Sequence, residues 1–231
     1  MSKRALGAQS QMKLQATRDL YAYWQNLRRG RTAPDRSEIE PADIRHLLGH
    51  TFILEVVSRR EYRFRLAGTR LCALYGREMK GKDFIDFWAG KDREAVVTML
   101  NAITEDAAAT VMGVSGRTDH GRTLAMEALM LPLKQGTDGY TRILGSLVPT
   151  DDPFWIGIHP IMTQDLASLR LIWPDEKPVG LMHSSAVPAM RGAQTATAHA
   201  DAVPMFQSRN MIVSNFRRQV QHLTVYDGGK E

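Results

Sequence analysis

Apolar residues recur every three or four positions near the start of the chain. The spacing predicts one amphipathic helix over about residues 10–29, whose apolar stripe consists of Met12, Ala16, Leu20, Trp24 and Leu27. Ser10 suits the start of this helix and Gly30 suits its end. We expect this stripe to be covered, either by its own domain or by a second copy of the chain.

The period changes to two from Thr51 onward. Alternating positions predict a hairpin of two strands, 51–57 and 62–66, followed by helical segments over 68–75 and 92–107. Three more strands are predicted over 110–117, 123–133 and 141–148, joined by turn-forming residues. Because short connections favour antiparallel pairing, we predict an α+β fold: a five-stranded antiparallel sheet with helices on one face, preceded by the N-terminal helix.

The pattern weakens after Pro149. Residues 166–173 are compatible with a strand or with a helical turn, and 174–208 are rich in Ala, Ser, Thr, Gly and Pro, as in a flexible linker. The predicted organisation is an N-terminal helix and connection over 1–36, a domain over 37–173, a linker over 174–208 and a C-terminal tail with a short strand over 209–231.

Composition places the chain among ordinary globular proteins, with 43% hydrophobic and 24% charged residues. The single cysteine, the absence of an apolar leader in the first residues, and the absence of a long apolar run favour the cytoplasm and no membrane span. The net charge of +5 is concentrated in residues 1–31, where only Asp19 opposes a set of seven basic residues: Lys3, Arg4, Lys13, Arg18, Arg28, Arg29 and Arg31. This basic segment is either a solvated surface or a site for a polyanion.

Several short motifs resemble one known family, the small alphaproteobacterial proteins built on a single PAS domain that was first catalogued as a domain of unknown function. They are Tyr23–Arg31 followed by Pro34, Glu40–Ile44, Leu47-Leu48 with His50, Phe64–Thr69, Tyr75–Gly81 and the closing His222–Val225 with Gly228-Gly229. The resemblance covers about residues 20–150 and the last ten. It implies a PAS fold used in bacterial signalling, with no catalytic residues to transfer.

A PAS-like sheet with helices on one face leaves a space between the two layers, where a small ligand can bind. Our candidates for its lining are Tyr75, Trp88, Met126 and Leu144, although buried aromatic and aliphatic residues can equally fill a core. Cys72 lacks the Asn-Cys-Arg context of flavin-adduct cysteines, so no cofactor is predicted and the ligand stays unidentified.

Other chemistry finds little support. His46 and His50 have the spacing of metal ligands on a helix, but no cysteine or carboxylate cluster completes a set, so no metal site is predicted. Asp119 and His120 fall in a predicted hairpin turn. No nucleophile motif or phosphate loop is recognisable, and we predict no enzyme.

Two functions follow. The first is a non-catalytic PAS-type sensory regulator that binds a ligand, a signalling protein partner or both, with homodimerisation through Leu20, Trp24 and Leu27 if that stripe is not covered by its own sheet. The alternative is a nucleic-acid-associated regulator using the basic N-terminal helix, which no helix-turn-helix or RNA-binding signature supports.

Overall fold

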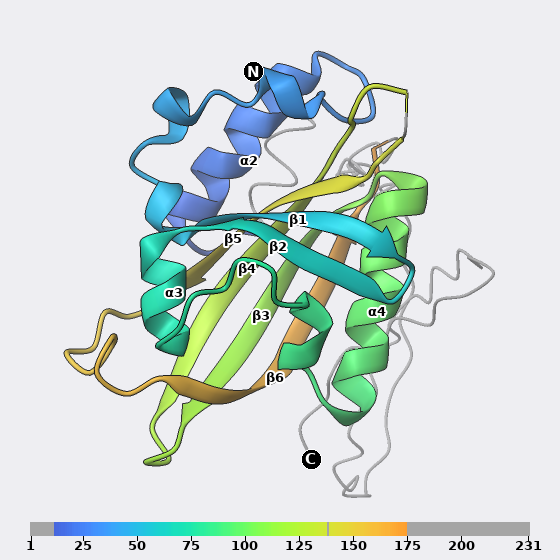
Figure 1. The fold of residues 1–231 in the computed structure, drawn as a ribbon. Coiled ribbons are helices and arrows are strands. Elements are labelled where there is room, and N and C mark those ends of the chain that lie inside the picture. The colour runs from blue at the N-terminus through green and yellow to red at the C-terminus, as the bar shows by residue number, and fades with distance from the viewer. Residues whose placement is uncertain (1–11, 138, 175–231) are drawn as a thin grey trace, which may run out of the picture. The chain divides into compact units, whose positions relative to one another are not determined.

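A single antiparallel sheet organises the part of the chain that the computed structural model describes, residues 12–137 and 139–174. Within these residues it has six strands in the order β2-β1-β5-β4-β3-β6 (Figure 1). Their bounds are β1 Thr51–Ser58, β2 Glu61–Ala67, β3 Ala109–Thr118, β4 Thr123–Leu133, β5 Arg142–Pro149 and β6 Ile161–Ile172. The α+β antiparallel prediction is confirmed. The count of five strands was one too low, because residues 161–172 pair with β3 along its whole length.

The front face of the sheet carries the helices that follow β2. They are α3 (Thr69–Tyr75), the 3-10 helix η4 (Phe84–Phe87) and α4 (Gly90–Asp106). Every second residue of the central strands points toward them: Phe52 and Leu54 on β1, Met112 and Val114 on β3, and Met126, Ala128 and Met130 on β4. This alternation gives the sheet one apolar face for these helices to cover.

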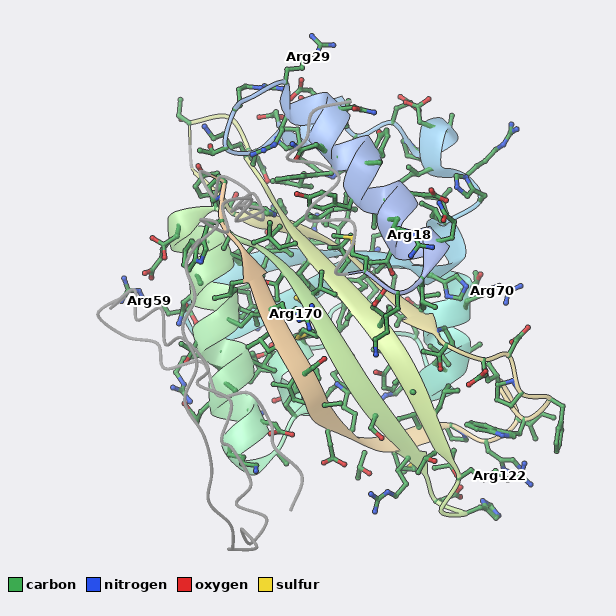
Figure 2. All side chains as sticks on the ribbon, turned by 180° about the vertical axis from the view of Figure 1, so that it is seen from behind. Arg18, Arg29, Arg59, Arg70, Arg122 and Arg170 are labelled. Atoms are coloured by element: carbon green, nitrogen blue, oxygen red, sulfur yellow. The ribbon has the colours of Figure 1, made fainter. Side chains whose placement is uncertain are left out.

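The back face carries α2 (Gln15–Arg28), which is followed by the short 3-10 helices η1 (Arg36–Glu38), η2 (Pro41–Ile44) and η3 (Leu48–His50) (Figure 2). Leu20 and Trp24 are 0% and 2% exposed, in a second apolar cluster with Leu129, Leu131 and Leu144 of the sheet. The apolar stripe of the N-terminal helix is therefore covered by its own sheet, and Leu27 packs at the edge of the same cluster.

Hydrogen bonds with β4, a strand distant in sequence, hold α2 near both of its ends. The carboxylate of Glu127 on β4, only 5% exposed, accepts from the backbone N–H of Lys13 at 2.8 Å and of Leu14 at 3.1 Å. These groups lie at the positive end of the helix dipole, where a carboxylate is favoured. Near the other end, Trp24 Nε1 donates to the carbonyl of Pro132 at 2.9 Å. The helix thus begins at Gln15, later than the Ser10 start expected from the sequence.

All described residues belong to one of two units of the chain, and the other unit, Val179–Leu223, lies outside them. The predicted tail over 209–231 and all but the first residue of the predicted linker over 174–208 also lie outside the described residues. Among the helices that are described, none combines the length and the apolar character required to cross a membrane.

Candidate functional site

The space between the front helices and the sheet is filled with aromatic side chains. The ring of Phe52 lies 5.5 Å from that of Phe64 and 6.1 Å from that of Phe84, and Phe84 lies 6.0 Å from Trp88. One cavity among these side chains has a volume of about 10 Å³ and is lined by Tyr75, Phe84, Trp88, Met112, Val114, Ala128, Leu147 and Gln164. Such a volume is close to the least that holds one water molecule.

A polar contact closes this small cavity on one side. The hydroxyl of Tyr75 on α3 donates a short hydrogen bond to Oε1 of Gln164 on β6, and both side chains are buried. Burial raises the pKa of the Tyr75 phenol far above its ordinary value, so the hydroxyl stays protonated and acts as the donor. The bond ties α3 to the strand that the sequence pattern left ambiguous.

The four pocket candidates from the sequence do not share one space. Tyr75 and Trp88 line the small cavity, and Met126 belongs to the same apolar cluster without lining the cavity. Leu144 lies on the back face, in the cluster that contains Trp24. Neighbouring residues of a strand point to opposite faces, and Leu144 follows Ile143, which takes the front position.

An open groove lies outside this packed interior. It has a volume of about 510 Å³ and is bounded by η3, α3, the end of β5 and the connection from β5 to β6. Its lining combines apolar and charged side chains: His50, Arg70, Ala73, Leu74, Val148, Pro149, Thr150, Asp151, Asp152, Pro153, Phe154 and Ile156. A volume of this size is typical of sites for small molecules.

His50 is the half-buried polar group of this groove. Burial, followed by the positive charge of Arg70, lowers the pKa of its imidazole, while a hydrogen bond to the backbone of Leu147 acts in the opposite direction. Among the described residues, its Nδ1 atom has no hydrogen-bond partner. The groove wall therefore presents a neutral imidazole beside an arginine.

The rim of the groove is exposed. Arg70, Asp151 and Asp152 are exposed, and the ring of Phe154 is 80% exposed, although Leu74 beneath them is only 2% exposed. Sequence reasoning missed these residues because the segment after Pro149 has no periodic pattern, and because Arg70 and His50 are far from it in sequence. The run Asp151-Asp152-Pro153-Phe154, with charge and an aromatic in one loop, was the available signal.

A comparison with known protein families identifies the family to which the chain belongs. The profile of a family described as a PAS domain matches residues 12–148, which is more than half of the sequence. The chain belongs to this PAS domain family. The matched residues include α2. PAS domains are sensory and regulatory modules in signalling, and this coarse role applies to the chain. No sequence among curated proteins matches it.

Solved structures similar to this PAS domain include two LOV domains and one further PAS domain. The dark-state LOV domain of the blue-light photoreceptor Aureochrome1 is 15% identical, with a TM-score of 0.38, over 47% of this chain and 80% of that one. The LOV domain of a blue-light-activated histidine kinase from Erythrobacter litoralis is 15% identical, with a TM-score of 0.36, over 45% and 96%. The PAS domain of an HTR-like protein from Haloarcula marismortui is 18% identical, with a TM-score of 0.35, over 47% and 89%.

A flavin-sized group does not fit the cavity beside Tyr75 and Trp88. Sites for such ligands have volumes of roughly 300–1,000 Å³, and the interior cavity has about 10 Å³. Cys72, the residue considered for a flavin adduct, lies on α3 and packs partly buried against the front cluster. We therefore derive no chemistry through a flavin.

Proposed function

We propose that this PAS domain is a non-catalytic regulator of bacterial signalling that binds a small ligand in the outer groove and acts on a signalling protein partner. The observation that carries the proposal is the contrast between the two spaces: about 10 Å³ in the packed interior and about 510 Å³ in the groove. The groove supports this role because α3 forms one wall, and α3 also contacts the interior through Tyr75. A ligand that moves α3 would thus be sensed by the core.

The lining indicates the chemistry of the ligand. Leu74 and Val148 offer apolar surface at the base, and the exposed ring of Phe154 offers a stacking face. Arg70 can pair with an anionic group, and Asp151 with a cationic one. We expect a small molecule with an apolar body and at least one charged group, in the cytoplasm of an alphaproteobacterium if the resemblance of the sequence motifs extends to the source.

The experiment fills the groove with a side chain. Ala73 on α3 lines the groove, and Ala73→Trp would occupy much of it, whereas Ala167→Trp adds the same ring at an exposed position of β6. The purified full chain is incubated with the small-molecule fraction of a bacterial extract, and added mass is measured by native mass spectrometry. We expect an adduct in the wild type and in Ala167→Trp and its loss in Ala73→Trp. An adduct that survives Ala73→Trp, or no adduct in any variant, contradicts the proposal.

The nucleic-acid alternative gains no further support. Arg18 donates to the carbonyls of Met12 and Lys13 at 2.7 Å and 2.8 Å, and Arg31 pairs with Glu38 at 2.7 Å, so part of the basic segment serves the fold. Of the arginines labelled in Figure 2, Arg18 and Arg29 lie on α2 and at its C-terminal end, and the other four come from other parts of the fold. A nucleic-acid role would require binding that weakens steeply with salt, and we leave it out of the proposal. Leu20 and Trp24 are buried against their own sheet, so they are not available for self-association and the proposal does not include it.

A further inference from the structure

Two loops at one end of the sheet are brought together by the pairing of β3 with β6. Thr118 is paired with Ile161, and His120 and His159 each lie two residues beyond this pair. His120 belongs to the turn between β3 and β4, and His159 belongs to the connection between β5 and β6. The two imidazole rings lie 4.6 Å apart between centroids, tilted by 50°.

A carboxylate completes the group. Oδ1 of Asp119 lies 2.6 Å from Nδ1 of His120, and one ligand atom from each of Asp119, His120 and His159 falls within 4.8 Å of the other two. An aspartate carboxylate is ionised at neutral pH and so is available as a ligand.

We propose that Asp119, His120 and His159 bind one divalent transition-metal ion of the Zn²⁺ class. Two imidazole nitrogens and one carboxylate oxygen are a ligand set that such ions prefer. At bond lengths of about 2.0–2.2 Å, tetrahedral ligands are roughly 3.3–3.6 Å apart, so small side-chain rotations from the observed spacing would suffice. The ion would replace the proton shared between Asp119 and His120, and water would fill the fourth position.

Two arginines close to His120 in sequence make contacts with other side chains. Arg122 stacks on the ring of Phe154, with its guanidinium carbon 5.3 Å from the ring centroid, and Arg117 lies 3.9 Å from the carboxylate of Asp165. Both of these arginines, which are close to His120 in sequence, therefore have contacts outside the group. Arg122 and Phe154 also join the same two loops as the histidines do, which favours a fixed geometry over two independent loops.

Binding of the ion would fasten the β5–β6 connection to the β3–β4 turn. The first half of that connection, residues 150–156, forms one wall of the outer groove. Sequence reasoning missed His159 because it lies 39 positions from His120 and no pattern predicted β6 in register with β3. The metal site rests on the geometry of the two histidines and the carboxylate, and it does not depend on a ligand in the groove.

The test is a titration of the metal-free full chain with Co²⁺, whose visible absorption reports nitrogen and oxygen ligands, and with Zn²⁺ by calorimetry. His183, His199 and His222 lie outside the described residues, so the informative quantity is the difference between variants. We expect His159→Ala and His120→Ala each to lose one equivalent of binding, with affinity lowered at least about tenfold. His46→Ala, which changes an exposed histidine outside the group, should bind as the wild type does.

Two results would overturn the site. The first is a wild type that binds no more Co²⁺ than His159→Ala, and the second is a loss of binding in His46→Ala as large as that in His159→Ala. His159→Gln serves as a second variant because it keeps a polar side chain at the position and should lose the same equivalent. Circular dichroism of each variant checks that it is folded.

Discussion

The two faces of the sheet are covered in different ways. The front face receives α3, η4 and α4, which follow β2 directly in sequence and fill the space beneath them with aromatic rings. The back face receives α2, which comes before the sheet in sequence and is fastened to β4 through Glu127 and Pro132, more than 100 residues away. The front face is filled by aromatic packing, with the Tyr75–Gln164 hydrogen bond between α3 and β6, whereas the back face combines packing with hydrogen bonds near both ends of α2.

The difference bears on function. The cavity beneath the front helices, at about 10 Å³, has no room for a ligand larger than a water molecule. The open volume lies at its border, in the groove beside α3. On the back face, Glu127 and Trp24 make the hydrogen bonds between α2 and β4. A substitution at either residue should therefore destabilise the whole of α2. Substitutions on each face can test this contrast.

The largest effect is expected from Trp24→Ala. The side chain is 2% exposed, and its Nε1 donates to Pro132. Removing it leaves a large void and loses the hydrogen bond to Pro132, so the free energy of unfolding should fall by about 3–5 kcal/mol. Urea unfolding followed by circular dichroism measures it. The matched control is Phe154→Ala, whose ring is 80% exposed, with a change below about 0.5 kcal/mol. Equal costs for the two would mean that α2 is not part of the cooperative unit.

The second largest loss of stability is expected from Glu127→Gln. The amide keeps one acceptor but presents an NH₂ group to one of the N–H donors of Lys13 and Leu14. Charge-assisted hydrogen bonds contribute roughly 1.5–3 kcal/mol, so we expect a loss of about 2 kcal/mol and faster hydrogen exchange in the first turn of α2. Glu105→Gln is the control, because its ion pair with Arg59 is exposed and should cost less than about 1 kcal/mol. Unchanged exchange in α2 would contradict the capping role.

Much of the front face could be predicted from the sequence, since alternation along β1, β3 and β4 identifies its buried positions. Leu66 shows the limit: simple alternation from Tyr62 and Phe64 would place it inward, but it is 44% exposed, because a register shift between Ile53 and Leu54 pairs it with Ile53. The cap of α2 could not be predicted, since Glu127 reads as an ordinary polar residue of a strand. The groove and the histidine group depend on the β5–β6 connection, whose position follows from pairing that a single sequence does not encode as a pattern.

The same substitution, Trp to Phe, can be made once on each face and the two losses of stability compared. Trp24→Phe removes the hydrogen bond to Pro132, and Trp88→Phe removes an indole N–H that has no acceptor among the described residues. Both changes also shrink a buried ring by a similar amount. We therefore expect the back-face variant to cost about 1 kcal/mol more than the front-face variant, as measured by urea unfolding. A larger cost for Trp88→Phe would reverse the contrast.

The smallest effect concerns pH at the groove. Because burial and Arg70 lower the pKa of His50 in the folded protein, the unfolded chain takes up a proton first as pH falls below about 6.5. The unfolded state then binds more protons than the folded state, so stability rises with pH and its His50 contribution is lost as pH falls from about 7 toward the lowered pKa. His50→Gln should flatten the pH dependence of the unfolding free energy between pH 7 and 5, and His46→Gln, at an exposed site, should leave it unchanged. An unchanged slope in His50→Gln would show that the imidazole is not held neutral by the groove wall, and the border of the front face would then be as open to water as the rim residues above it.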